Sequence, residues 1–216
     1  MIGRPVLYDY WRSSASYRVR IALSLVDRAY DRRAVDLLAG AHHAPDYLVV
    51  NPQALVPALV IDGRTLTQSL AIIEYLHATT LGSTLLPSDP IGQHRVRQLS
   101  YAIAMEIHPI CNTSVAAHVS DLTGGGDEAK MAWMDRFIGQ GLAKLETMLD
   151  QGGAGAFCYG EYPTMADCCL IPQIYNADRW GVEYACHPNI SRIARTARAL
   201  NAFSATEPEG IGPPQN

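Results

Sequence analysis

The sequence lacks the features that mark several broad classes of protein. No apolar stretch is long enough to cross a bilayer, and the chain reaches Asp9 before any apolar run that could serve as a signal peptide. Basic residues are not in excess, because the formal net charge is -4, whereas nucleic-acid and anionic-membrane partners generally require a basic face. We therefore expect a soluble cytoplasmic protein that binds neither, and in which a few local arginines would hold an anionic substrate.

Signatures of metal binding, thiol redox chemistry and phosphate binding are missing as well. The five cysteines all fall in the second half of the chain, form no C-x-x-C pair and keep no metal-ligand spacing with the seven histidines. The glycine-rich stretches at 124–126 and 152–153 are not followed by the Lys-Ser/Thr of a phosphate-binding loop. The sequence therefore predicts buried free thiols, no metal site, and glycine loops that join helices.

Two different patterns follow one another along the chain. In the first part, about eighty residues, short apolar runs alternate with helical stretches, which is typical of a small α/β unit closed by a hairpin and a helix. Asp62-Gly63 is the clearest local signal, because this pair supplies the positive φ angles of a tight turn. The predicted elements of this part are strands at 5–8, 33–37, 58–61 and 65–67, and helices that begin around Ser13-Ser14 and Gln68-Ser69.

The second part of the chain has a long helical pattern. Its predicted helices lie at 92–107, 128–149, 164–180 and 189–200, with an extension past Pro109. Thr164 and Asp167 are spaced as a capping box at the start of one of these helices, and the tail at 207–216, rich in proline and glycine, is expected to fray. The sequence thus predicts an α/β domain over residues 1–83 and an all-helical domain over residues 88–216.

The first candidate site lies where the first strand gives way to the first helix. Free backbone amides and the positive end of the helix dipole meet there, so a thiolate beside Ser13 or Ser14 would be stabilised. A hydroxyl that donates to the sulfur would lower its pKa further, and Ser13 is the first candidate for this role and Ser14 the second. Both serines could instead serve only to cap the helix, which is the commoner role of serine at such a position.

Two further positions could hold an extended peptide. Val56-Pro57 precedes the third strand, where proline withholds a ladder donor and leaves the neighbouring backbone groups free to pair with a ligand. Gln68-Ser69 opens a helix with an amide and a hydroxyl, which can bind a carboxylate and an ammonium at one end of a small peptide. Taken alone, Ser69 is also well suited to cap that helix.

These pieces, in this order, resemble the glutathione transferase superfamily, in which a thioredoxin-like domain precedes an all-helical domain. The resemblance covers nearly the whole chain and points to the zeta class, which includes maleylacetoacetate and maleylpyruvate isomerases. The segments that carry it are Trp11-Arg12-Ser13-Ser14-x-Ser16-x-Arg18-Val19-Arg20-Ile21-Ala22-Leu23, Asn51-Pro52-Gln53-x-x-Val56-Pro57 and Gln68-Ser69-Leu70-Ala71-Ile72-Ile73-Glu74-Tyr75-Leu76.

The resemblance implies that glutathione is the cofactor and that its parts have separate contacts. Val56 would pair through its backbone with the cysteinyl part, while Gln68 and Ser69 would hold the γ-glutamyl end. The resemblance adds three further glutathione-binding candidates, of which the histidines would lie near the glycyl carboxylate: His42, His108 and Asn112. A lone histidine on a helix, such as His108, is however often only a structural residue.

One departure from the family pattern bears on the chemistry. The family usually shows Ser-Ser-Cys-Ser, whereas this chain has Ala15 in place of the cysteine. Reductive dehalogenation and glutaredoxin-like exchange need a protein thiol to resolve a mixed disulfide, so both are disfavoured. Cis–trans isomerisation needs no such thiol, because the glutathione sulfur itself adds to the conjugated double bond, permits rotation and is then expelled.

Two arginines are candidates for binding an anionic substrate, on which negative charge develops during that reaction. Arg12 lies next to the proposed thiolate, and Arg179 matches an arginine of the bacterial maleylpyruvate isomerases; a planar guanidinium suits a carboxylate. Alternatively, Asp178 or Asp167 could simply pair with Arg179. Those isomerases have a further arginine that this chain lacks, so the resemblance does not select maleylpyruvate over maleylacetoacetate.

The leading hypothesis from the sequence is a glutathione-dependent cis–trans isomerase of a maleyl-substituted oxo acid, acting in the breakdown of aromatic compounds. One rival is a general glutathione transferase or peroxidase that uses the same thiolate on other electrophiles. The other rival is a non-catalytic module that keeps the fold for protein assembly. The resemblance also implies that the protein is a homodimer.

Overall fold

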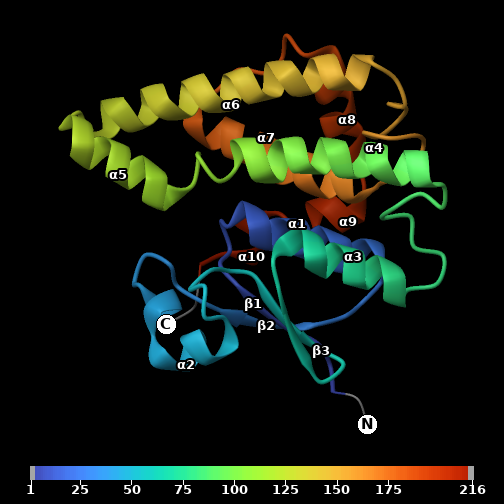
Figure 1. Cartoon of the computed structure of the whole chain (residues 1–216), viewed down its shortest axis with the longest axis horizontal. Coiled ribbons are helices and arrows are strands. Elements are labelled where there is room, and N and C mark those ends of the chain that lie inside the picture. Colours follow the sequence, from blue (N-terminus) through green and yellow to red (C-terminus); the bar gives the residue numbers. More distant parts are fainter. Residues whose placement is uncertain (1–2, 214–216) are drawn as a thin grey trace. The chain divides into compact units, whose positions relative to one another are not determined.

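Residues 3–213 are described by a computed structural model, in which the chain forms two units. The first unit takes in the chain up to Leu86 together with the segment from Leu200 onward, and the second takes in Pro87–Ala199 (Figure 1). The division after Leu86 lies near the boundary predicted from the sequence. The return of the chain to the first unit differs from the predicted helical domain, which ran to residue 216.

The first unit is built on a four-stranded mixed sheet. Its strands are β1 (Val6–Asp9), β2 (Asp31–Ala34), β3 (Ala58–Ile61) and β4 (Arg64–Thr67), in the spatial order β2-β1-β3-β4. β1 and β2 are parallel, as a helical crossover between them requires, whereas β3 is antiparallel to both of its neighbours. Alternation along β1 points Leu7 and Asp9 to one face of the sheet and Tyr8 to the other.

Helices cover both faces of this sheet. α1 (Ser14–Leu25) and α3 (Ser69–Thr79) pack against each other on one face (Figure 1). A short 3-10 helix, η1 (Ala41–His43), leads into α2 (Pro45–Val50) on the opposite face, where the rings of Tyr8 and Tyr47 lie 5.9 Å apart. Leu7 and Asp9 are therefore enclosed between the sheet and α1, and both are fully buried.

Local signals explain the hairpin and the end of β2. Asp62 and Gly63 have φ angles of 52° and 72°, the left-handed pair of a two-residue turn, which confirms the predicted hairpin. β2 ends at Ala34, earlier than predicted. The Asp36 carboxylate accepts a hydrogen bond from the Leu38 amide at 2.9 Å, and such a local turn competes with continued strand pairing.

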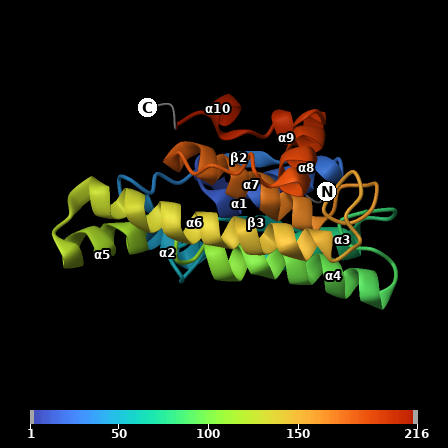
Figure 2. The same cartoon turned by 90° about the horizontal axis from the view of Figure 1, so that it is seen from above.

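Within the described residues, every regular element of the second unit is a helix. They are α4 (Pro90–Tyr101), η2 (Ala102–Ile107), α5 (Thr113–Thr123), α6 (Gly126–Asp150), α7 (Met165–Trp180) and α8 (Pro188–Arg198). In both views α5 folds back along the first part of α6 (Figures 1 and 2). η2 is a π-helical stretch that continues α4, so the helix predicted at 92–107 changes its hydrogen-bond pattern before it ends.

The predicted capping box at the start of α7 is confirmed. The Thr164 amide donates to the Asp167 carboxylate at 2.8 Å, and the reciprocal bond from the helix to the Thr164 side chain is also present. The same carboxylate accepts from the Cys158 amide at 2.8 Å, and all three residues are buried. Burial raises the pKa of the Cys158 thiol well above its usual value, so the thiol stays protonated. This helix terminus is closed and structural.

The C-terminal segment is helical, and its second helix lies in the tail at 207–216 that was predicted to fray. It forms α9 (Asn201–Ser204) and α10 (Pro208–Ile211), while residues 214–216 of the predicted tail lie outside the described residues. The Tyr17 hydroxyl donates to the Phe203 carbonyl at 3.3 Å, and Arg20 Nε donates to the Thr206 carbonyl at 3.1 Å. These bonds to α1 attach the segment to the first unit.

The prediction of buried free thiols is right for four of the five cysteines, which are Cys111, Cys158, Cys168 and Cys169. It is wrong for Cys186, whose side chain is exposed because it lies in the loop before α8. Within residues 3–213, no group of histidine, cysteine and acidic residues is arranged to hold a metal ion. No helix in the same range is both long and apolar enough to cross a membrane.

Candidate active site

Ser13 is the N-cap of α1. Its side-chain oxygen accepts a hydrogen bond from the Ser16 amide at 3.2 Å, and its own amide donates to the Tyr10 carbonyl at 2.9 Å, which closes a turn before the helix. The capping role that the sequence allowed is therefore present. It leaves room for a second role, because a hydroxyl that accepts one bond still has its own O–H to donate.

Ser14 is the first residue of α1 and is 8 % exposed. Among the bonds within residues 3–213, none involves its hydroxyl, and the amides of Ser14 and Ala15 also have no partner, as is usual in a first helical turn. Two amides and the hydroxyls of Ser13 and Ser14 are thus available as donors to a thiolate. Both serines stay candidates for the hydroxyl that stabilises it.

Arg12 is exposed beside this turn. Its guanidinium lies 4.0 Å from the centre of the Trp11 ring, and no ion pair in the described part of the chain involves it. A cation–π contact at an exposed site is worth only ~0.5–1 kcal/mol. The Arg12 guanidinium can therefore leave the Trp11 ring and bind an incoming carboxylate.

Val56 and Pro57 are joined by a cis peptide bond just before β3. Val56 as a whole is 9% exposed, and among the described residues neither its amide nor its carbonyl has a hydrogen-bond partner. The preceding Leu55 carbonyl is fixed by the Tyr47 hydroxyl at 2.6 Å and by Asn51 Nδ2 at 2.7 Å. Burial raises the pKa of Tyr47 to about 12, so this hydroxyl stays a donor. The backbone of Val56 is held in place and free to pair.

The start of α3 corrects the expectation that Ser69 caps this helix. Gln68 is the N-cap, and no side chain caps the helix. Ser69 is the first helical residue, and its hydroxyl instead accepts a hydrogen bond from Arg18 Nη1 at 3.3 Å. Gln68 has a φ of 66°, a strained conformation of the kind found at ligand sites, and its Nε2 donates to Gln53 Oε1 at 3.0 Å. The first amides of α3 are open to a ligand carboxylate.

The sheet brings these three positions together. Ala58 of β3 pairs with Tyr8 of β1 on one side and with Thr67 of β4 on the other. Because β3 is antiparallel to both neighbours, the residues after β1, before β3 and after β4 leave the sheet at the same end: residues 10–14, Val56-Pro57 and Gln68-Ser69. Two helix N-termini and one free stretch of extended backbone meet there, which suits a short anionic peptide.

His42 lies in η1 of the same unit. Its ring centre is 4.0 Å from that of His43, and its Nδ1 is buried with no hydrogen-bond partner in the described part of the chain. Burial, and to a lesser extent His43, lowers the pKa of His42. A neutral imidazole would contact a carboxylate as a hydrogen-bond donor and not as a cation.

His108 and Asn112 belong to the second unit. His108 follows η2, and its amide donates to the Ile103 carbonyl at 3.0 Å. Asn112 is the N-cap of α5, where its side-chain oxygen accepts from the Val115 amide at 2.9 Å. This capping role was not foreseen from the sequence. It occupies the side-chain oxygen of Asn112 and leaves its NH2 group as the part that could serve a ligand.

Arg179 is exposed on the last turn of α7, also in the second unit. Neither acid considered as its partner takes that role, because Asp178 pairs with Arg198 at 2.7 Å and Asp167 belongs to the capping box. The alternative in which one of them occupies Arg179 is therefore wrong. Within residues 3–213 no ion pair involves Arg179, and its guanidinium is available to a ligand.

Sequence reasoning missed three buried charged residues next to the α1 terminus. Asp9 and Arg20 form an ion pair at 2.7 Å, and Arg18 holds Ser69. A signal existed for Asp9, which follows Leu7 at the two-residue spacing of an inward-facing strand. The arginines were harder to find, because α1 is buried on nearly all sides and an apolar stripe marks only one of them.

Comparison with family models assigns the first unit. Residues 6–78 match the model described as glutathione S-transferase, N-terminal domain. With its four-stranded mixed sheet and its helices on both faces, the first unit is therefore a thioredoxin-like domain of the glutathione S-transferase type.

Proteins of known name are similar to this chain over nearly its whole length. A maleylacetoacetate isomerase of Rhizobium meliloti (strain 1021) is 56% identical over 213 residues, which make up 99% of this chain and 100% of that protein. A maleyl pyruvate isomerase, described as a bacterial zeta-class glutathione S-transferase, has a holo structure that matches with a TM-score of 0.91 at 36% identity, covering 95% of this chain and 97% of that one. A maleylacetoacetate isomerase from Methylobacterium extorquens AM1, solved with bound malonate and glutathione, matches with a TM-score of 0.92 at 38% identity, covering 97% and 100%.

The chain belongs to the zeta-class maleylacetoacetate isomerase family of glutathione S-transferases. This membership confirms the resemblance found in the sequence. It also confirms the predicted fold class, a thioredoxin-like α/β domain combined with a helical part. The roles of individual residues stay predictions.

Proposed function

We propose that this protein is a glutathione-dependent cis–trans isomerase of a maleyl-substituted oxo acid that acts in the catabolism of aromatic compounds. One observation carries the proposal. Ala58 is paired on both sides, so the α1 terminus, the free Val56 backbone and the uncapped α3 terminus lie at one end of the sheet. Family membership supplies the reaction class, since a relative that this chain covers completely is a maleylacetoacetate isomerase.

Glutathione fits the groups that this end of the sheet leaves without partners. Its γ-glutamyl carboxylate would take the open amides of α3, with Gln68 and Ser69 beside it. The backbone of Val56 would pair with the cysteinyl part, which would give hydrogen-bond partners to an amide and a carbonyl that have none in the described chain. Pro57 ends this stretch and donates no competing bond. The remaining candidates for glutathione binding are His42, His108 and Asn112.

The α1 terminus would keep the bound sulfur ionised. When bound, glutathione supplies a thiolate that adds to the conjugated cis double bond and leaves again after rotation about the resulting single bond. The amides of Ser14 and Ala15 favour negative charge at the helix terminus, and the hydroxyls of Ser13 and Ser14 can donate to it. The methyl group of Ala15 is compatible with this chemistry, because no protein thiol is required.

Arg12 and Arg179 are proposed to bind the anionic substrate. Both are exposed, and neither has an ion-pair partner in the described part of the chain. A guanidinium matches a carboxylate through two parallel hydrogen bonds and would offset the negative charge that develops on the oxo acid. The Methylobacterium relative was solved with malonate, a dicarboxylate, together with glutathione, which supports a small anionic substrate.

The test is a spectrophotometric assay with maleylacetoacetate and with maleylpyruvate, each in the presence and absence of glutathione. We expect at least one acid to be isomerised, and only when glutathione is present. Turnover of haloacids or hydroperoxides alone, in a parallel panel, would instead assign a general transferase or peroxidase function. Failure to bind glutathione in a calorimetric titration would leave a non-catalytic module and overturn the proposal.

We also propose that the enzyme works in the cytoplasm as a homodimer. The support for both statements is the likeness to the zeta class. Light scattering on the purified protein should give about twice the chain mass of 23.6 kDa, and cell fractionation should recover the protein with the cytoplasmic fraction. A monomer mass at assay concentration would contradict the assembly without affecting the proposed reaction.

A further inference from the structure

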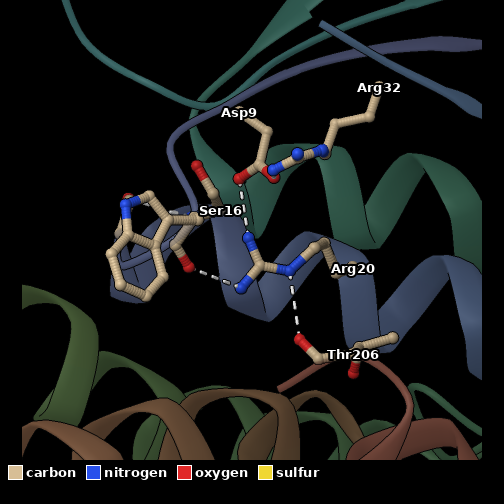
Figure 3. A network of polar contacts seen from close by, with 7 residues as sticks. Asp9, Ser16, Arg20, Arg32 and Thr206 are labelled. Carbon is tan, nitrogen blue, oxygen red and sulfur yellow. Dashed lines mark hydrogen bonds and ion pairs between the residues drawn. The ribbon is translucent and has the colours of Figure 1, made fainter. Parts of the chain in front are cut away.

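A buried ion pair lies next to the α1 terminus, between Asp9 at the end of β1 and Arg20 in the middle of α1 (Figure 3). Arg20 Nη1 is 2.7 Å from Asp9 Oδ1, and neither side chain has exposed area. Arg32 of β2 approaches the other carboxylate oxygen only to 3.6 Å and is 26% exposed. Arg20 is therefore the main partner of the Asp9 carboxylate.

Arg20 uses its other two nitrogens on backbone carbonyls from distant parts of the chain. Nη2 donates to the Trp11 carbonyl at 3.0 Å, and Nε donates to the Thr206 carbonyl at 3.1 Å. Trp11 lies inside the turn that the Ser13 amide closes on Tyr10. One guanidinium thus connects the end of β1, the turn before α1 and the C-terminal segment (Figure 3).

A second donor of α1 holds the same C-terminal segment. The Tyr17 hydroxyl donates to the Phe203 carbonyl at 3.3 Å, and the Thr206 hydroxyl closes the end of α9 by donating to the Ala202 carbonyl at 2.8 Å. The Arg20 guanidinium also lies 5.1 Å from the centre of the Tyr17 ring. The C-terminal segment is therefore a fixed support for Arg20.

Stability alone explains this ion pair poorly. Desolvation of two charges offsets much of their attraction, and well-packed apolar side chains often stabilise a fold as well or better. Apolar side chains could not replace the planar guanidinium of Arg20, whose donors point in fixed directions and reach three acceptors at once. The Arg20 guanidinium holds the Trp11 carbonyl in place. This contact also fixes the direction of the amides and hydroxyls of the residues after Trp11. Stabilisation of a charge by preset dipoles depends on that direction.

We propose that Arg20 is a positioning residue for the thiolate site and that the C-terminal segment is part of the same support. Arg20 acts through the Trp11 carbonyl, with Asp9 as its counter-charge and the Thr206 carbonyl as its third anchor. The effect on thiolate chemistry rests on the proposed function, whereas the effect on the backbone of the turn does not. Without the Arg20 guanidinium, the turn before Ser13 moves more freely and a sulfur bound there ionises at higher pH.

The decisive variant is Arg20→Lys, which keeps a positive charge for Asp9 but cannot donate to both carbonyls. Its matched control is Arg32→Lys, the same change in the other cation near Asp9. In the glutathione-free proteins, amide hydrogen exchange across residues 11–16 should become about tenfold faster in Arg20→Lys, as expected for loss of a hydrogen bond from a charged donor. The control should exchange at the wild-type rate. Equal rates in all three proteins would overturn the proposal.

The ionisation of bound glutathione, followed by ultraviolet absorbance of the thiolate as pH rises, is the second readout. In Arg20→Lys we expect the pKa of the bound thiol to rise by about one unit and the acidic limb of the kcat–pH profile to move to higher pH by the same amount. The KM for glutathione should stay within about twofold. A change in this KM alone would contradict a positioning role. If the wild-type protein binds no glutathione, the proposed function fails while the exchange measurement still decides the role of Arg20.

Asp9→Asn keeps the test decisive if Arg20→Lys does not fold. Asparagine offers an oxygen acceptor of the same shape but no charge, so the Arg20 guanidinium is held less firmly. We expect smaller changes in the same direction in both readouts. Wild-type exchange and a wild-type thiol titration in folded Asp9→Asn protein would overturn the proposal.

Discussion

Helices in the two units begin in contrasting ways. At α7 of the second unit, Thr164 and Asp167 satisfy one another, Asp167 also takes the Cys158 amide, and all three residues are buried. In the first unit no side chain caps α3, and at α1 the cap Ser13 satisfies the Ser16 amide but leaves the first two amides open. The terminus of α7 is therefore closed by its own side chains, whereas α1 and α3 keep open amides.

The contrast depends on acidic residues in the first turn. Asp167 occupies that position in α7, whereas the first turns of α1 and α3, both within the described chain, contain no acidic residue. A carboxylate there would take the same amides that an anionic ligand needs and would repel the ligand. Its absence leaves the positive ends of α1 and α3 open, as the proposed contacts with a thiolate and a carboxylate require.

The largest effect is expected from opening the closed terminus. Asp167→Ala removes the acceptor of the Thr164 amide, the Thr164 hydroxyl and the Cys158 amide, all of them buried. A buried donor left unpaired costs ~1–3 kcal/mol, so the free energy of unfolding, measured with urea, should fall by at least ~3 kcal/mol. The control Asp178→Ala loses partly exposed contacts with Arg198 and Tyr184 and should change it by only about 1 kcal/mol. An equally small loss for Asp167→Ala would break the contrast.

Next in size is the effect of Ser13→Ala at the open terminus of α1. Removing a hydrogen bond to a thiolate, worth ~1.5–3 kcal/mol, should lower turnover about ten- to a hundredfold with little change in the KM for glutathione. Loss of the cap should also lower stability by ~1 kcal/mol. Steady-state kinetics on Ser13→Ala and Ser14→Ala compares the two hydroxyls. A larger loss for Ser14→Ala would move the role to Ser14, and unchanged turnover in both would leave the amides alone.

A smaller effect is expected from Arg179, in the last turn of α7. Arg179→Ala should raise the KM for the oxo acid about tenfold, the value of one lost hydrogen bond from a charged donor, and raise the KM for glutathione much less. Arg136→Ala, an exposed arginine of α6, is the control and should change neither constant. If Arg179→Ala raised both constants equally, Arg179 would not be a substrate clamp.

The smallest effect should come from Gln68, the uncapped start of α3. Gln68→Gly relieves the positive φ but adds chain entropy, so the net gain in stability should be at most ~1 kcal/mol, measured by thermal unfolding. The KM for glutathione should rise severalfold because the side chain is lost. Gln68→Ala keeps the strained backbone and should show the same rise in KM without the gain in stability. A Gln68→Gly protein that is less stable than Gln68→Ala would show that the positive φ at this position costs little.

Features set by neighbouring residues could be predicted from the sequence, whereas features set by distant partners could not. Asp62-Gly63 and the pair of Thr164 and Asp167 determine their own geometry, and both predictions were confirmed. The expectation that Ser69 caps α3 was wrong because Arg18, from another helix, takes its hydroxyl. The positions Ser13, Val56-Pro57 and Gln68-Ser69 were identified in advance, but only strand pairing puts them at one end of the sheet.

The C-terminal segment shows a second limit of sequence reasoning. Fraying was predicted for the tail at 207–216, but the groups that attach the C-terminal segment to α1 are the backbone carbonyls of Phe203 and Thr206, just before that tail. Any residue could provide a carbonyl, so the side chains of this segment carry no signal for the contact. The donors Tyr17 and Arg20 are informative residues, but their acceptors cannot be recognised from sequence.

The interrupted first unit has a consequence for how the protein is made. On the ribosome, α1 emerges long before the carbonyls of Phe203 and Thr206 that accept its hydrogen bonds, and all of the second unit is synthesised in between. Domains generally fold as units during synthesis, those nearer the N-terminus first. Here neither bond to α1 can form until the end of the chain has been made. The unit that begins first therefore cannot be completed before synthesis of the second unit is over.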